Sequence, residues 1–397
     1  PPLGKARSCP NMPGYLDILR PNLFTQVVKQ VVADSDWILG FMGFEPGGRN
    51  EVFEGHGREG IYHVWDDPRT AAKGRAPGTP AARSAKQAMK AVPFTYPRMH
   101  DSISLLAEFF HNIGRIGDPV TRDEAGKDMI MRQTQVLLKK AANWRVAMTV
   151  GMLRDQLYYH ESGDDWHLSY TSGSAIMQNN FRVPAGNKSQ LNMTTRASVS
   201  VHGANIIDVP WSSPGANIPR HFALINKARA AQGLGPVRNV LGGSLLWQYL
   251  AQNDFLVTQA GIANAPFEYY ERDASTRPDG TKVHRYLGRF KALPGVDFHI
   301  ADTGLELWDG SAFTFTPHFP DTMALMMGDP DDAGKYKIMQ GSEPIAEYDG
   351  GPESVKVGLA SWSKKTSNPT ATEVFVLDNA LAVPHDPYDL IPATVVF

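Results

Sequence analysis

Residues 121–156 read TRDEAGKDMIMRQTQVLLKKAANWRVAMTVGMLRDQ, a stretch that predicts the longest element of the fold. Thr121 and Glu124 form a T-x-x-E capping box, which indicates the start of a helix. Apolar residues then recur at three- and four-residue steps, or sums of them, along one stripe: Ile130, Leu137, Ala141, Trp144, Met148 and Met152. We expect a helix from about 122 to 156, a strut of about 50 Å at about 1.5 Å per residue. The stripe is interpreted as core packing rather than as a cofactor groove.

Size and composition indicate a soluble globular protein with more than one domain. The 397 residues exceed one small core and predict two or three domains, at roughly 100–200 residues each. Hydrophobic residues make up 42% and charged residues 20%, which is ordinary for this class. The 39 basic and 41 acidic residues give a net charge of −2, so a protein that grips the nucleic-acid backbone is not expected.

The sequence has no targeting or membrane segment that we can identify. The N-terminal stretch PPLGKARSCPNMPGYLD contains basic residues but no apolar run, so no signal peptide is expected. Eighteen apolar residues never run together, so no membrane span is expected. The single cysteine, Cys9, cannot form an intramolecular disulfide or a thiolate zinc site by itself, which fits a reducing cytoplasm.

Two projecting segments are predicted near the N-terminus. The first ~20 residues are rich in proline and glycine and lack a period, which indicates an extended arm. LFTQVVKQVVADSDWI (23–38) then predicts a short amphipathic helix, whose apolar side is made of Phe24, Val27, Val28, Val31 and Val32.

The second projecting segment is a long hairpin with a basic tip. GIYHVWDD (60–67) and KAVPFTYPRM (90–99) each predict a strand, and residues 68–90 lie between them. This tip has six basic residues and no acidic one: Arg69, Lys73, Arg75, Arg83, Lys86 and Lys90. Its composition indicates an exposed, flexible segment. Because it has no aromatic side chain to stack on bases, a nucleic-acid hook is not favoured.

Beyond Tyr159 the pattern alternates between strands and helices. WHLSY, AIMQNNFRV and ASVSVHGANIIDV predict strands, and PRHFALINKARAAQGLG and SLLWQYLAQND predict helices. Further strands are predicted in FHIADTGLELWDG, AFTFTPHF and TMALMMG, and again from residue 355 to the end.

One short stretch gathers the side-chain types of a metal or catalytic site. HESGDDWH (160–167) contains two histidines, one glutamate and two aspartates. Its glycine and aspartates also suit a turn, and His160 would interact favourably with the C-terminal end of the preceding helix when charged. We interpret the stretch as a helix-to-strand turn, with a metal-dependent hydrolase as the alternative.

Other chemical motifs are incomplete or absent. GDPDDAGKYKIMQ resembles a calcium loop at Asp329, Asp331 and Gly334, but Ala333 and Gln340 stand where ligands are needed. The sequence has no G-x-S-x-G, G-K-[ST] or H-E-x-x-H motif. We therefore predict no catalytic, cofactor-binding or metal-binding residue, no cofactor and no enzyme activity.

Two C-terminal stretches resemble a known family. FHIADTGLELWDGSAFTFTPHFPDTMALMMGDP is similar to its strand, aspartate–glycine turn, strand and Phe-Pro-Asp run that leads into an apolar strand. WSKKTSNPTATEVFVLDNALAVPHDPYDLIPATVV is similar to its closing segment in Trp362, the apolar run around Val374 to Leu377, Pro384 and Asp386-Pro387. With the order of elements, these stretches resemble the major capsid protein of tailed bacteriophages, in the lambda-type family with the Hong Kong 97 capsid fold.

The resemblance implies an α+β fold with a particular division of the chain. The expected segments are an N-terminal arm (1–45), an extended β-hairpin loop (46–100), a peripheral domain with the spine helix (101–213), an axial domain (214–354) and return strands of the peripheral domain (355–397).

The resemblance also implies a function. The chain is expected to be a major capsid (head) protein that assembles with copies of itself into hexamers and pentamers of an icosahedral shell. That shell would enclose double-stranded phage DNA without sequence-specific binding, in a virion assembled in the host cytoplasm. A decoration protein, a scaffold and a portal are further partners that the resemblance allows, and no membrane is involved. The alternatives are an encapsulin-like protein compartment and the hydrolase that would use HESGDDWH.

Overall fold

The computed structural model describes residues 21–33, 36–53, 59–66, 88–106, 119–163, 165–188, 199–202, 204–257, 267–268, 285–331, 334–346, 353–367 and 370–396. The helices are α1 (Pro21–Ala33), α2 (Trp37–Met42), α4 (Pro119–Arg154), α5 (Ile218–Gln232), α6 (Ser244–Ala251) and α7 (Asp254–Val257), with the 3-10 turns η2 (Ala185–Lys188) and η3 (Pro387–Asp389). The strands up to residue 242 are β1 (Glu51–Phe53), β2 (Glu59–Asp66), β3 (Ala88–Thr95), β4 (Arg98–Leu106), β5 (Leu157–Ser162), β6 (Asp165–Ser169), β7 (Met177–Asn179), β8 (Val199–Val201), β9 (Ala204–Ile207) and β10 (Asn239–Gly242). The later strands are β11 (Phe267–Glu268), β12 (Arg285–Phe290), β13 (Asp297–Ile300), β14 (Gly304–Trp308), β15 (Phe313–Pro317), β16 (Met323–Met327), β17 (Tyr336–Gln340), β18 (Ser342–Ala346), β19 (Glu353–Val357), β20 (Leu359–Ser367), β21 (Thr370–Pro384) and β22 (Ile391–Thr394). Helices and sheets are mixed along the chain, so the fold class is α+β, as predicted.

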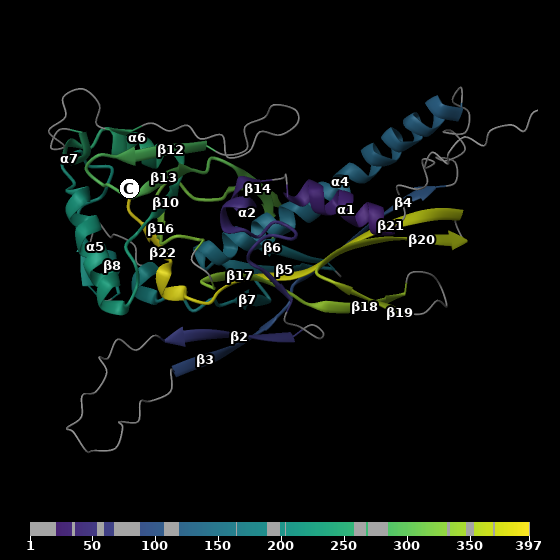
Figure 1. Ribbon diagram of the computed structural model, residues 1–397, viewed down its shortest axis with the longest axis horizontal. Coiled ribbons are helices and arrows are strands. Elements are labelled where there is room, and N and C mark those ends of the chain that lie inside the picture. Colours follow the sequence, from purple (N-terminus) through teal and green to yellow (C-terminus); the bar gives the residue numbers. More distant parts are fainter. Residues whose placement is uncertain are drawn as a thin grey trace, which may run out of the picture.

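Strand β21 is the centre of a five-stranded sheet (Figure 1). Its 15 residues pair antiparallel with β20, β4 and β17, and β1 joins β17 in parallel. Phe375 lies opposite Trp362 of β20 and Ser102 of β4, and the Trp362 and Phe375 rings stack with centroids 5.2 Å apart. One long strand therefore holds together segments that are far apart in the sequence.

The second large sheet has six strands in the order β11-β12-β13-β10-β16-β22. All five residues of β16 are buried. Met323, Leu325 and Met327 belong to the core around α4, whereas Ala324 and Met326 belong to a second core. Because alternate side chains of a strand point to opposite faces, both faces of this strand are covered. This explains why TMALMMG is a continuous apolar run rather than an alternating one.

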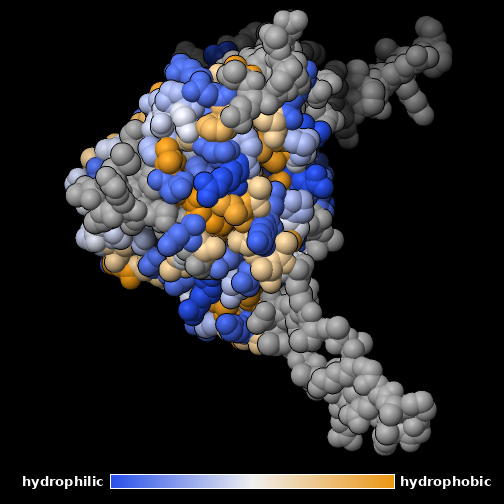
Figure 2. Space-filling model, turned by 90° about the vertical axis from the view of Figure 1, so that its left-hand side faces the viewer, coloured by the Kyte–Doolittle hydropathy of each residue, from blue (hydrophilic) through white to orange (hydrophobic). Residues whose placement is uncertain are grey.

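Helices α5 and α6 pack on one face of the six-stranded sheet. Phe222 of α5 and Trp247 of α6 contact Phe298 of β13, with ring centroids 6.3 and 6.4 Å apart. Asn217 caps the start of α5, and Gly233 ends it in the left-handed conformation with φ of 98°. Figure 2 views the molecule from the side that carries α5 and α7, where hydrophobic areas are small and surrounded by hydrophilic residues.

Helix α4 has 36 residues, which corresponds to about 54 Å at ~1.5 Å per residue. It begins at Pro119 and ends at Arg154, slightly earlier at both ends than predicted. Because the helix begins at Pro119, Thr121 lies within its first turn, so the predicted capping box, with Thr121 as N-cap, is wrong. The side chain of Ile130 lies outside the described part. The other members of the predicted stripe are buried or half-buried: Leu137, Ala141, Trp144, Met148 and Met152. The strut helix and its core-facing stripe are thus confirmed.

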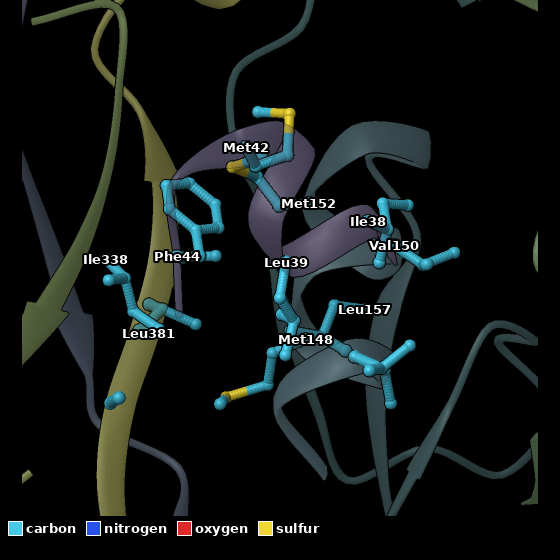
Figure 3. Close-up of a cluster of buried hydrophobic side chains, with 14 of the residues drawn as sticks. Ile38, Leu39, Met42, Phe44, Met148, Val150, Met152, Leu157, Ile338 and Leu381 are labelled. Atoms are coloured by element: carbon cyan, nitrogen blue, oxygen red, sulfur yellow. The ribbon is translucent and has the colours of Figure 1, made fainter. Parts of the chain in front are cut away.

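The last turns of α4, from Arg145 to Arg154, are buried on all sides, which a single stripe did not predict. Every residue from 145 to 155 is buried, Arg145 and Thr149 included. Figure 3 shows Met148 and Met152 of this helix beside Leu39 and Met42 of α2. Helix α2 thus packs on the predicted stripe, whereas Arg145 faces Asp378 and Glu51 of the five-stranded sheet.

The predicted helix over 23–38 is two helices. Helix α1 ends at Ala33, and α2 begins at Trp37 after an N-cap at Asp36, whose Oδ1 accepts the Ile38 N–H at 3.0 Å. Val28 and Val32 are fully buried, so the predicted apolar side is confirmed where it is described. Helix α2 packs its apolar residues against α4 (Figure 3).

Two strands cross the expected division of the chain. β17 lies within 214–354 but pairs with β21 of the five-stranded sheet, from Tyr336 opposite Pro384 to Gln340 opposite Ala380. β22 lies within 355–397 but pairs with β16 of the six-stranded sheet. Each large sheet therefore contains a strand from the segment that was assigned to the other.

A buried ion pair joins α4 to the five-stranded sheet. Arg145 donates from Nε and Nη2 to the two carboxylate oxygens of Asp378 in β21, at 2.7 and 3.1 Å. Both side chains are fully buried. Arg145 Nη1 also donates to Glu51 of β1 at 3.2 Å, and Glu51 accepts a second bond from Gln340 of β17. A buried charge is costly without its partner, so this network holds one helix and three strands in register.

Asp378→Ala should strongly destabilise the protein, because it leaves the Arg145 charge buried with only Glu51 to pair with it. The free energy of unfolding should fall by about 3–5 kcal/mol, measured by urea unfolding. The matched control is the double variant Arg145→Met with Asp378→Leu, which removes both charges and should recover most of the loss. A double variant no more stable than Asp378→Ala would contradict this role of the pair.

Candidate assembly surface

The β2–β3 hairpin packs one face on the body of the protein. Its inward side chains are buried: Tyr62, Val64, Val92 and Phe94. The Tyr62 and Phe94 rings lie 5.9 Å apart, and Phe94 meets Tyr96 edge-on at 4.8 Å. His385 Nδ1 donates to the carbonyl oxygen of His63 at 2.9 Å. The base of the hairpin is therefore held firmly against the end of β21.

The opposite face of the same hairpin carries exposed apolar residues, beside Glu59, His63 and Thr95. Ile61 is 53% exposed and Met89 is 48% exposed, and Ala91 and Pro93 on this face are exposed as well. β2 and β3 form a sheet of two strands by themselves. Two-stranded ribbons are marginally stable alone, and exposed apolar patches commonly mark interaction sites. We call these four residues the hairpin outer face.

The strand predicted over 60–67 is β2, whereas the one predicted over 90–99 covers β3 to Thr95 and the start of β4 at Arg98. The hairpin outer face was not predicted. The predicted tip, residues 68–90, lies outside the described residues except at its last three positions, and so does the predicted N-terminal arm up to residue 20. The signal for the outer face was present in IYHVW and KAVPF, where apolar residues occupy both parities of each strand. A strand with one solvated face would alternate more strictly.

HESGDDWH forms a β-hairpin, so its prediction as a helix-to-strand turn is corrected. β5 and β6 place His160 opposite His167 and Ser162 opposite Asp165. Gly163 follows Ser162 with φ of 67°, a conformation that hairpin loops require and glycine adopts without strain. Helix α4 ends at Arg154, and His160 lies in β5, beyond the last turn of the helix. The predicted effect of the helix dipole on His160 is therefore wrong.

The two histidines of this hairpin have structural contacts. His160 is buried, and its Nε2 donates to the carbonyl oxygen of Thr171 at 3.0 Å. The His167 ring stacks on Trp308 with centroids 4.9 Å apart and meets Phe313 edge-on at 5.2 Å. Within the described ranges, no three His, Cys, Asp or Glu side chains gather into a group that could hold a metal. The geometry therefore offers the hydrolase alternative no metal-binding cluster in this part of the chain.

The stretch that resembles a calcium loop uses its carboxylates locally. Asp329 Oδ1 accepts the N–H of Asp331 at 3.0 Å, and Asp331 pairs with Arg49. Gln340 belongs to β17 and donates to Glu51. These side chains point to different partners and do not converge on one position.

A second buried charge network joins the two sheets at Asp389 in η3. Arg229 of α5 donates to Asp389 Oδ1 at 2.6 Å and to its carbonyl oxygen at 2.8 Å. Oδ2 accepts the Tyr336 hydroxyl of β17 at 2.5 Å and the Gly328 N–H at 2.9 Å. Burial by itself would raise the pKa of Asp389, but Arg229 and Lys335 lower it overall. One ionised carboxylate thus ties α5, β17 and the C-terminal segment together.

Asp386, just before η3, is in the opposite situation. Burial raises the pKa of Asp386 to about 6, and the negative charge of Asp389 adds to the rise. Lys335 and Arg229 act against it but are insufficient to restore the ordinary value. The ionised form of Asp386 is therefore less favourable in the folded protein than in the unfolded chain.

Asp386→Asn should stabilise the protein at neutral pH. With a pKa raised from 3.8 to about 6, the folded state binds more protons than the unfolded state between these values, so this group lowers stability as pH rises through that window. The amide of the variant does not titrate at this position. The free energy of unfolding of the variant should therefore exceed that of the wild type by an amount that grows between about pH 4 and about pH 6 and then levels off near ~3 kcal/mol or less. Urea unfolding of both proteins across this range measures the difference, and a pH-independent difference would show that Asp386 is not perturbed.

Comparison by sequence finds no matching family profile and no matching curated protein. In fold, the chain is similar to a phage-related protein from Bordetella bronchiseptica RB50, at 9% identity and a TM-score of 0.48 over 93% of this chain and 96% of that one. It is similar to a chain of the satellite phage P4 procapsid, at 12% identity and a TM-score of 0.44 over 94% and 91%. It is also similar to an encapsulin from Synechococcus elongatus PCC 7942, at 9% identity and a TM-score of 0.39 over 87% and 84%. Because these TM-scores lie below 0.5, we base the functional proposal on the architecture of the chain itself.

Proposed function

We propose that this chain is a major capsid protein of a tailed bacteriophage, which assembles into hexamers and pentamers of an icosahedral shell around double-stranded DNA. The observation that carries the proposal is the hairpin outer face, where Ile61 and Met89 leave an apolar ribbon uncovered. A second copy of the chain is the partner that a shell supplies at every such face. Many modest contacts of this kind add up to a stable particle.

The proposed division of the chain follows the sequence segments, with the two strand exchanges added. The arm (1–45), the extended loop (46–100), the peripheral domain (101–213 and 355–397) and the axial domain (214–354) are joined by β17 and β22. The networks at Arg145 and Asp389 stiffen this body. A stiff body with projecting elements suits a subunit that must meet several neighbours at fixed angles.

The proposal assigns the chain no catalytic role and no cofactor. Its buried carboxylates Asp378 and Asp389 are paired with arginines, which is typical of structural networks. The proposed partners are copies of itself, with a decoration protein, a scaffold and a portal as further candidates, and the proposed location is the virion after assembly in the host cytoplasm. The net charge of −2 suits packing beside both other subunits and enclosed DNA. No helix in the described ranges is long and apolar enough to cross a bilayer.

The purified native protein should sediment as particles of megadalton size, because a closed icosahedral shell contains many copies of a 43.6 kDa chain. Electron microscopy of the same fractions should reveal capsomers with fivefold and sixfold symmetry. A protein that stays a monomer or dimer in its mature source would contradict the proposal. Particles that contain protein cargo instead of double-stranded DNA would replace it with the encapsulin-like alternative.

Substitution of the hairpin outer face should prevent assembly without unfolding the subunit. Ile61→Lys with Met89→Lys places two charges where an apolar neighbour is expected, and particle yield should fall by about tenfold or more, since the same loss repeats at every copy. The control, Ile61→Val with Met89→Leu, keeps the face apolar and should assemble normally. Circular dichroism melting of both variants should match the wild type, because neither residue is buried in the subunit. Normal particle yield from the lysine variant would mean that this face is not an interface.

A further inference from the structure

A cavity of about 480 Å³ lies between the β2–β3 hairpin and the rest of the chain. The hairpin lines it with Val64, Lys90 and Val92, and the rest of the chain lines it with Arg182, Pro387 and Tyr388. Small-molecule sites in proteins commonly have volumes of roughly 300–1,000 Å³. The cavity is therefore large enough for a small organic ligand, and the chemistry of its walls indicates the class of that ligand.

Lys90 adds a positive charge to a wall that is otherwise apolar. In the antiparallel register Lys90 lies opposite Val64, and Val92 lies opposite Tyr62, so these four side chains share the inward face of the hairpin. Val64 and Val92 are buried, whereas Lys90 is exposed. The ammonium group is therefore accessible to a ligand that enters the cavity from solvent.

Hydrogen bonds hold the segment that carries Arg182. The Phe181 N–H donates to Asp155 Oδ1 at 3.0 Å, and the Arg182 N–H donates to Asn180 Oδ1 at 2.9 Å. Burial raises the pKa of the Tyr62 hydroxyl, Asp155 adds to the rise, and the positive charge of Arg182 opposes it. The guanidinium group of Arg182 therefore lies near the inward face of the hairpin, which also carries Lys90.

The two positive charges have no counter-charge in the part of the chain that the structure describes. Neither Lys90 nor Arg182 forms an ion pair with a described residue. The carboxylate of Asp155 already accepts from the Phe181 N–H and from Lys188. Two cations that face one cavity without a carboxylate partner favour an anionic ligand.

Tyr388 gives the cavity a flat aromatic wall whose position is fixed. The Tyr388 ring is half-buried and stacks on His202, with 6.4 Å between centroids and 22° between planes. Asn187 Nδ2 donates to the carbonyl oxygen of Tyr388 at 3.4 Å. A fixed ring beside Pro387 and the two valines suits a flat, largely apolar body.

Backbone strain is concentrated around the same cavity. In the described ranges, the non-glycine residues with a left-handed backbone are Asp155 (φ 52°), Arg182 (φ 65°) and His202 (φ 49°). Arg182 lines the cavity, Asp155 holds the residue before it, and His202 stacks on Tyr388. Such conformations are uncommon for residues other than glycine and cluster at functional sites.

We propose that this cavity binds an organic phosphate monoester. Its phosphate group pairs with Lys90 and Arg182, and its flat body packs against Tyr388 and the two valines. A phosphate monoester carries about −1.5 to −2 charges at pH 7, which matches two cations, and a guanidinium group binds phosphate oxygens in a bidentate manner. Because Lys90 belongs to the hairpin and Arg182 to the body, the ligand also holds the two parts together. This inference goes beyond the proposed function and does not depend on it.

Isothermal titration calorimetry on the purified chain tests the site, with adenosine monophosphate and phenyl phosphate as probes. Both should bind at one site per chain, and Lys90→Gln or Arg182→Gln should each weaken binding about tenfold, because each removes one charge-assisted contact. Lys90→Arg keeps the charge and should bind within about threefold of the wild type. The matched control, Arg132→Gln with Lys139→Gln, removes two exposed charges from α4 and should leave the affinity unchanged. All variants should melt at the wild-type temperature, since none of these side chains is buried.

Two simpler ligands separate the contributions of charge and apolar body. Inorganic phosphate has the charge without the body, and adenosine has the body without the charge. Each should bind at least about tenfold more weakly than adenosine monophosphate.

Hydrogen–deuterium exchange gives an independent measurement. The backbone amides of β2 and β3 should exchange more slowly with adenosine monophosphate present, because the ligand joins the hairpin to the body. The double variant Lys90→Gln with Arg182→Gln should show no such slowing.

Three results would overturn the inference. The first is no saturable binding of either phosphate ester. The second is equal affinity of the wild type and the double variant, which would place the ligand elsewhere. The third is inorganic phosphate that binds as tightly as adenosine monophosphate, which would show that the apolar wall is not used. None of these results bears on the capsid function, and a chain that binds the esters but forms no particles would overturn that function alone.

Discussion

The bond between Arg145 and Asp378 is the constraint on which the rest of the structure depends. A fully buried guanidinium tolerates little displacement from its carboxylate, because each would then be left charged in a medium of low dielectric. The pair therefore fixes α4 at one position along β21. Since β21 also pairs with β4, β17 and β20, the location of one side chain determines how the long helix lies against most of the five-stranded sheet. Polar atoms of Glu51 and Gln340 extend the same constraint to the sheet edge.

The network at Asp389 fixes the position of the two sheets relative to each other, as the Arg145 network fixes α4 against the five-stranded sheet. Its carboxylate collects donors from α5, β17 and the turn after β16, so the C-terminal segment cannot move without breaking bonds to both sheets. The exchanged strands β17 and β22 also connect the two sheets. A body held in this way transmits force between its ends as one unit.

Three hairpins of similar local pattern have different surroundings. The β2–β3 hairpin buries Tyr62 against the body and leaves Ile61 exposed. The β5–β6 hairpin, which carries HESGDDWH, places His160 in the interior and stacks His167 on the third hairpin, β14–β15. In each hairpin, one face packs against the rest of the chain and the other face is exposed. The uncovered faces carry the exposed side chains of Ile61, Met89, Trp166, Phe313 and Phe315.

Elements whose signals are local could be predicted from the amino-acid sequence. The stripe from Leu137 to Met152 predicted α4, and the apolar runs on both sides of residues 68–90 predicted β2 and β3, because periodicity and composition act within a few turns or one strand. Only the tertiary structure decided that Arg145 is buried, that the helix over 23–38 breaks at Asp36, and that β17 and β22 exchange sheets. Charged residues are ordinarily exposed, and the burial of Arg145 depends on Asp378, a partner 233 positions away that no local pattern can identify. For the same reason HESGDDWH read as a polar turn: what its histidines contact is set by Thr171 and Trp308, which the fold alone brings beside them.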